Sequence, residues 1–467
     1  MHANSSLLLS STGHFFVTFL ESLEEPPLKS FVSFGFVYFC IQTTQIALGH
    51  LRSLTVQYEV PMVEAGTTLG LGGGLYVKPG VEPTQLPSPP APKLLGPFEP
   101  LIRFSGLDCH KLRKESIRSV KGVVSAVVAL IILVIMVIEI FTYMGIQDKP
   151  FSVGWAESTA YAFMALQAFI SAIAVICWTR ENFVSQFEDT LSRLRTMRLS
   201  TSQSIDDYTN FHRKAAVMIV PIFAVVLSTS FYSSVTNRYQ LNDNSTFYSE
   251  SILHQFAPFI DFVGCLASSM AIIVYVTVNT ALNREIKHFN KELTNSARFQ
   301  QLTLPQVLNN YSKRHSDLIQ LTRFVNQHLS KYGAIVPLFS LTAFINVSYI
   351  VGSFKASLDP VMYVLLNGWT IVCMGITIAG LSPLVKVQNN IQETAEILMH
   401  DDVLQTCGDD QMHHTYRVTL DRCLHSNSKM AFLNAFPVDS NCFNRIMFFV
   451  PNISAAMILY RLSHPYL

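Results

Sequence analysis

The chain has 467 residues, of which 49% are hydrophobic and only 14% are charged. A soluble domain carries about 25% charged residues, so this composition excludes an ordinary water-soluble protein and indicates a surface that largely faces lipid. The net charge of +1 gives no support for nucleic-acid binding, and the eight scattered cysteines exclude a dense disulfide scaffold.

The first hundred residues differ in character from the rest of the chain. Gly66–Gly74 is glycine-rich and Pro79–Pro100 is proline-rich, which is typical of flexible chain followed by a stiff, extended linker. We therefore expect residues 1–100 to be mostly disordered, with a candidate membrane-associated patch at residues 31–47. That patch is short and carries Gln and Thr pairs, so it is not counted as a span.

Seven later stretches approach or exceed the roughly 20 apolar residues that a membrane-spanning helix needs. They are Gly122–Ile146, Val153–Trp178, Ala215–Val235, Phe256–Leu282, Tyr332–Val351, Val361–Val385 and Phe443–Tyr460. The sequence therefore predicts an all-α, polytopic membrane protein whose seven-helix transmembrane domain covers residues 101–467. Four prolines at 221, 337, 383 and 451 are expected to bend their helices, and Pro451 is expected to break the shortest one.

Lysine and arginine alternate between the connections. The segment before the first span has six, and the connections 179–214, 284–331 and 386–442 have six, eight and four. The other connections have one each, Lys149, Arg238 and Lys355. Because these residues collect on the cytosolic side, the N-terminus is predicted to be cytosolic and the C-terminus extracellular. Asn244 opens an Asn-Ser-Thr sequon in the longest outer connection and is a glycosylation candidate.

The long inner connections carry a helical pattern. Phe183, Phe187, Leu191 and Leu194 recur at helical spacing, and a second apolar series follows Pro305 into the fifth span. These patterns predict that the membrane helices continue into the cytosol and pack there as a bundle. The alternative is amphipathic helices that lie on the inner leaflet.

Enzyme motifs are absent from the sequence: it has no P-loop, no GxSxG and no HExxH. We expect no enzymatic activity and no cofactor. The His, Cys and Asp residues between His400 and His425 fit no standard zinc spacing, so this segment is expected to be a solvated polar loop without a metal.

Ionisable and aromatic residues gather in the predicted outer halves of the spans, where they suggest a polar-lined cavity open to the outside. The pocket candidates are Glu139, Tyr143, Trp155, Tyr161, Tyr232, Asp261, Tyr349, Tyr363, Asn367 and Trp369. The alternative is that the aromatic residues are interfacial anchors and that the carboxylates simply reach water.

The C-terminal residues carry the most specific resemblance to a known family. Insect gustatory receptors have Thr-Tyr, five hydrophobic residues and Gln-Phe in the last span; residues 454–462 here keep that spacing but depart at all four signature positions. Phe436–Arg445 and His315–Val351 are also similar to family segments. Residues 101–467 thus resemble the insect gustatory and odorant receptor superfamily, and the divergence resembles its nematode members, the serpentine receptor class R and gustatory-receptor-like proteins.

This resemblance implies a sensory chemoreceptor of the plasma membrane with a small-molecule ligand and an outer pocket between spans one and six. Many members are ligand-gated cation channels in which four copies of the last helix line the pore. Ser454, Ala455, Ile458 and Arg461 are then pore-lining candidates in a homo- or hetero-tetramer whose subunits are joined by the cytosolic bundle. Four copies of Arg461 would repel cations. Either this side chain points away, or it lies in a wide outer mouth, or the protein does not conduct alone.

Two other classes remain as alternatives. A G-protein-coupled receptor has the opposite topology, which would place the lysine-rich and arginine-rich connections outside. The sequence also lacks Asp-Arg-Tyr after span three and Asn-Pro-x-x-Tyr in span seven. A transporter often shows two related halves, and no such duplication is visible.

Overall fold

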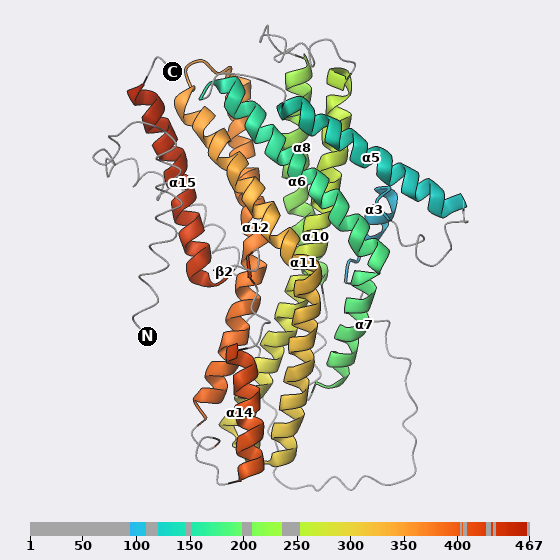
Figure 1. Ribbon diagram of the computed structural model, residues 1–467, viewed down its shortest axis with the longest axis vertical. Helices are drawn as coiled ribbons and strands as arrows, with labels where there is room; N and C mark the ends of the chain where they lie inside the picture. Colours follow the sequence, from blue (N-terminus) through green and yellow to red (C-terminus); the bar gives the residue numbers. More distant parts are fainter. Residues whose placement is uncertain are drawn as a thin grey trace. The chain divides into compact units, whose positions relative to one another are not determined.

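Helices make up nearly all of the described chain in the computed structural model (Figure 1). The structure describes residues 94–108, 120–144, 151–198, 208–235, 253–401, 404, 409–425, 431–432 and 436–464, all within the compact unit Gly80–Leu467. The candidate patch at 31–47 and the glycosylation candidate Asn244 lie outside the described residues.

Seven of the described helices are long and apolar enough to cross a membrane. They are α5 (Val120–Met144), α6 (Val153–Glu181), α8 (Thr209–Val235), α10 (Leu253–Arg298), α11 (Pro305–Ser353), α12 (Pro360–Met399) and α15 (Ser440–Ser463). Each predicted span coincides with one of these helices. Pro451 does not break α15, and the helices that contain Pro221, Pro337 and Pro383 are also continuous.

Three helices extend far beyond a bilayer. The 49 residues of α11 correspond to about 74 Å at 1.5 Å per residue, against a hydrocarbon core of about 30 Å. The helices α10 and α12 extend in the same way (Figure 1). We call residues 283–298, 305–331 and 386–399 of these helices, together with α7 (Phe183–Thr196) and α14 (Asp410–His425), the stem.

The stem is a packed bundle within one chain. The apolar face of α7 is fully buried against α10 and α11. The ring of Phe183 stacks on Phe324 at 5.4 Å and on His328 at 4.8 Å between centroids. Leu318 and Val325 of α11 lie in the same core. This burial favours the predicted bundle over helices that lie flat on a leaflet.

The segment expected as a polar loop contains the helix α14, so that prediction was wrong over Asp410–His425. Met412, Tyr416, Thr419 and Cys423 are buried at spacings of four, three and four residues, which place them on one helix face. This face packs on α11 and α12. The helical pattern of these four residues is hard to recognise in the sequence, because most of the residues between them are polar.

The folded region begins before residue 101. The helix α3 (Phe98–Phe104) crosses the predicted boundary, and Leu94, Leu95 and Ile102 are buried around it. The remaining described elements are short. They are a 3-10 turn at Gln301–Thr303 and a two-residue antiparallel ladder between β1 (Ala431–Phe432) and β2 (Phe436–Pro437). Ala431 pairs with Pro437 and Phe432 with Phe436.

Candidate ligand pocket

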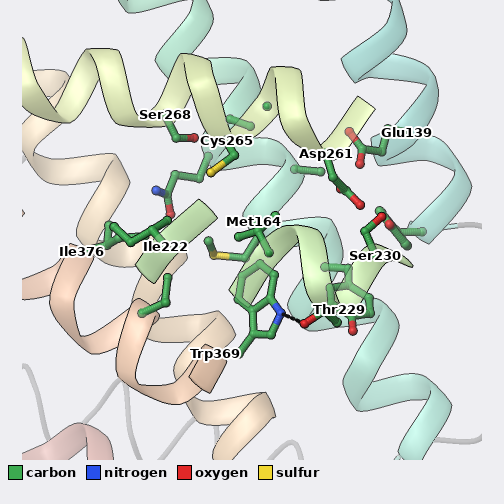
Figure 2. Close-up of a pocket in the computed structure, with 18 of the residues that line it drawn as sticks. Glu139, Met164, Ile222, Thr229, Ser230, Asp261, Cys265, Ser268, Trp369 and Ile376 are labelled. Carbon is green, nitrogen blue, oxygen red and sulfur yellow. Dashed lines mark hydrogen bonds between the residues drawn. The ribbon is translucent and has the colours of Figure 1, made fainter. Parts of the chain in front are cut away.

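A pocket lies among α5, α6, α8, α10 and α12 (Figure 2). Its α10 and α12 residues precede the parts of these helices that belong to the stem. Its empty space is about 780 Å³, open solvent at the mouth included. None of the described residues that line it is a lysine or an arginine.

Helical spacing brings the α10 residues to the pocket. Asp261, Cys265 and Ser268 are separated by four and three residues, so they share one face. Gly264 lies beside them, and a Cβ there would be 3.3 Å from the Cβ of Ala168 on α6. The absence of a side chain at Gly264 therefore allows α6 and α10 to approach closely in the pocket wall.

Two carboxyl groups meet on one side of the pocket. Glu139 of α5 and Asp261 of α10 lie within hydrogen-bonding reach of each other, and Ser230 of α8 lies near Asp261 (Figure 2). Glu139 is 9% exposed. Two carboxyl groups can share a hydrogen bond only if one of them holds a proton, because two adjacent carboxylates repel each other. The pair therefore forms an acidic site that a single cation can complete.

Aromatic rings form another wall. Tyr161 lies with its ring centroid 5.5 Å from that of Tyr143 and 6.0 Å from that of Trp369. The indole nitrogen of Trp369 donates a 3.0 Å hydrogen bond to the hydroxyl of Thr229 (Figure 2). This bond satisfies the indole and holds its apolar face toward the pocket.

Three buried polar side chains of the lining have no hydrogen-bond partner in the protein. Both amide atoms of Gln167 and the hydroxyls of Ser230 and Ser233 lack a hydrogen bond among the described residues. Gln167 is 0% exposed and Ser233 is 2% exposed. Buried polar atoms are rarely left without partners, so these groups indicate where a polar ligand group would be received.

Five of the ten predicted pocket residues come together in this one pocket: Glu139, Tyr143, Tyr161, Asp261 and Trp369. They lie on four different helices. Only their tertiary arrangement makes them neighbours.

Two other candidates surround Phe151 at a separate place. The ring of Trp155 lies 5.5 Å from that of Phe151, and the hydroxyl of Tyr349 donates to the Phe151 carbonyl oxygen at 2.7 Å. The ring of Tyr460 on α15 lies 5.4 Å from the same phenyl ring, tilted by 46°. These residues thus tie the start of α6 to α11 and α15.

The last three candidates also lie outside the pocket. Tyr232 donates a hydrogen bond to Asp359, the N-cap residue of α12. The amine of Lys355 lies 5.7 Å from the centre of the Tyr363 ring. The side-chain amide of Asn367 donates to the Tyr363 carbonyl oxygen at 2.7 Å, one turn back along α12.

Sequence reasoning missed the small polar residues of α8. Thr229, Ser230 and Ser233 are all buried and line the pocket, whereas Phe231 between them is 58% exposed. Thr229, Ser230 and Ser233 are separated by one and three residues, which places them on one side of a helix, and this spacing could have identified them as lining residues.

The pore-lining candidates of α15 are packed inside the chain. Ser454, Ala455 and Ile458 are buried, and Ile458 lies where a side chain at Gly352 of α11 would have to go. The guanidinium of Arg461 lies 5.4 Å from the centre of the Phe354 ring. Their place at a pore stays a prediction.

In the described part of the chain, no three His, Cys, Asp or Glu side chains converge as metal ligands. Within the segment weighed for a metal, Cys423 lies with its sulfur 3.4 Å from Nε2 of His315. Burial raises the pKa of the Cys423 thiol to about 12, so this thiol keeps its proton near neutral pH and is a poor ligand.

Comparison with solved structures defines the class. The fold matches the insect olfactory receptor OR5 from Machilis hrabei in complex with eugenol, with a TM-score of 0.55, 11% identity, and 77% of this chain and 96% of that chain covered. Another structure of the same receptor matches with a TM-score of 0.55 and 9% identity, and the match covers 77% of this chain and 98% of that chain. The protein is therefore a multi-pass membrane protein with an insect olfactory receptor-like fold.

The family follows from the sequence match. Residues 94–454 match the model described as Caenorhabditis protein of unknown function, DUF267, and the chain belongs to this family. A search of curated protein sequences finds no match. The narrower assignment to serpentine receptor class R or gustatory-receptor-like proteins stays a prediction.

Proposed function

We propose that the protein is a chemoreceptor of the plasma membrane in which a small molecule, bound in the pocket around Trp369, opens a cation channel. The observation that carries this proposal is the pocket itself. It combines apolar and aromatic walls with a few buried polar groups, which is the usual make-up of a small-molecule site. The fold is shared with an olfactory receptor whose structure contains eugenol.

The proposed channel is a homo- or hetero-tetramer with α15 around its axis, and the N-terminus is cytosolic. The distribution of lysine and arginine supports this orientation. One side of α15 packs on α11, while Arg445, Phe448, Phe449 and Leu462 are exposed. This exposed side is available for contacts with other subunits. Arg461 is directed toward Phe354, which supports the view that its charge points away from permeating cations.

Recording currents tests the proposal. Cells that express the full chain are exposed to a panel of small organic compounds, and at least one compound is expected to evoke a cation current. Trp369→Leu removes part of the pocket wall and is expected to raise the half-maximal concentration about tenfold, since one lost aromatic contact is worth about 0.5–1.5 kcal/mol beyond its area.

Tyr363→Leu is the matched control, because Tyr363 lies on the same helix but outside the pocket. It is expected to leave the half-maximal concentration within twofold of the wild type. A surface-expressed protein that gives no current with any compound, alone or with other family members, contradicts the channel proposal.

A further inference from the structure

The two carboxyl groups of the pocket have no cationic partner in the lining. Glu139 and Asp261 lie together, and the described lining contains no lysine or arginine. Charged groups in a membrane protein are costly unless they are paired or reach water. A site that keeps two carboxyl groups side by side is therefore set up for a cation from outside the protein.

A second observation concerns the rest of the pocket lining, beyond the two carboxyl groups. The labelled lining residues run from Glu139 and Asp261 past Met164 and Trp369 to Ile376 (Figure 2). Gln167 follows Met164 by three residues on α6, which places it about 4.5 Å further along the helix axis. Both of its side-chain amide atoms are buried without a partner. The pocket thus has an acidic side, an apolar and aromatic middle, and an amide.

We infer that the pocket selects small protonated amines, with the ammonium group held between Glu139 and Asp261 and the apolar body against Trp369. This inference rests on the proposed function and names its ligand class. The ammonium donates up to three hydrogen bonds, which the two carboxyl groups and Ser230 can accept. The Trp369 and Tyr161 rings contact the body, and Gln167 receives a polar group on it.

Binding by the purified full-length chain in lipid nanodiscs, near neutral pH, tests the inference with two probes. Tyramine carries an ammonium group, and 4-ethylphenol is the same molecule without it. Isothermal titration is expected to show tyramine binding at least tenfold more tightly, equivalent to about 1.4 kcal/mol. This comparison uses the wild-type protein only, so it does not depend on the folding of a variant.

The double variant Glu139→Gln with Asp261→Asn is expected to abolish the preference for tyramine while it still binds 4-ethylphenol. Glu157→Gln is the matched control. Glu157 is also a buried carboxyl on α6, but it does not line the pocket, and the glutamine of that variant can still accept the hydrogen bond from Tyr161. This control is expected to keep the preference.

Equal affinities for the two probes in the wild type, or a preference that survives the double variant, overturn the inference. Absence of binding by both probes also overturns it. The proposed function fails separately. If a neutral compound evokes currents that depend on Trp369 while tyramine has no advantage, the chemoreceptor proposal stands and only the ligand class is wrong.

Discussion

Arg314 lies at the centre of a buried ion cluster in the stem. Its guanidinium pairs with Glu292 and lies 3.4 Å from Glu285, and Arg198, two residues after α7, also pairs with Glu285. His288 is 3.6 Å from Glu292. The Arg and Glu side chains are no more than 8% exposed. The cluster links three segments that are far apart in the sequence.

Arg314→Met is expected to destabilise the protein by about 3–5 kcal/mol, because it leaves two carboxylates buried with only one arginine to compensate them. Arg323→Met is the control on the same helix, since Arg323 is exposed, and its effect is expected to stay within about 0.5 kcal/mol. Thermal unfolding of the purified variants in one detergent measures both. Equal losses of stability in the two variants would show that the buried ion cluster contributes no more than an exposed arginine.

At the scale of elements, the crossing of α11 and α12 depends on a glycine. A Cβ at Gly380 would lie 2.6 Å from Cγ of Pro337, whose ring cannot move aside easily. Tyr275 of α10 donates a 2.7 Å hydrogen bond to the Gly380 carbonyl oxygen. Three long helices, α10, α11 and α12, thus contact one another at this point, where the spans pass into the stem.

Gly380→Ala is expected to cost about 1–3 kcal/mol, the usual range for overpacking. Gly375→Ala on the same helix has no atom within 4 Å of the new methyl group. It is expected to stabilise the helix by about 0.5–1 kcal/mol, because alanine is the better helix former. Thermal unfolding of the pair separates the two effects. A neutral Gly380→Ala would mean that Pro337 gives way.

At the scale of the whole molecule, the orientation in the membrane separates the proposed channel from a G-protein-coupled receptor. With tags at both ends, we expect an antibody to reach only the C-terminal tag on unpermeabilised cells, since the lysine-rich and arginine-rich connections belong in the cytosol. In this topology the sequon at Asn244 lies outside the cell and can be glycosylated. Asn244→Gln is therefore expected to increase gel mobility, because the variant lacks the glycan. Staining of the N-terminal tag alone would contradict the proposed topology and favour G-protein coupling.

The spans and the helical stem could be predicted because each depends on a local pattern. A run of about 20 apolar residues and an apolar residue every three or four positions are both visible in a single segment. The helix α14 was missed because only four of the residues in this helix whose burial is described are buried. Helix α3 was missed because it adjoins a proline-rich stretch and has only seven residues.

The pocket shows where local patterns stop. Glu139 and Asp261 stood out because a carboxyl in a span is costly wherever it lies. Tyr349 and Tyr363 were equally plausible, yet they contact Phe151 and Lys355 instead. No local sequence pattern distinguished Gln167 as a pocket residue. Whether such a side chain faces lipid, another helix or a cavity depends on the rotation of its helix, which one helix cannot specify.

The sequence by itself determined that this is a seven-helix membrane protein with long helical extensions, since apolar length and periodicity act within each segment. Only the tertiary structure decided which five of the ten candidates share a pocket and that α15 buries Ser454 and Ile458 against α11. The physical reason is that a site is formed by side chains from several helices. Their convergence depends on crossing points such as Gly264 and Gly380, where the packing of two backbones sets the position of every residue around them.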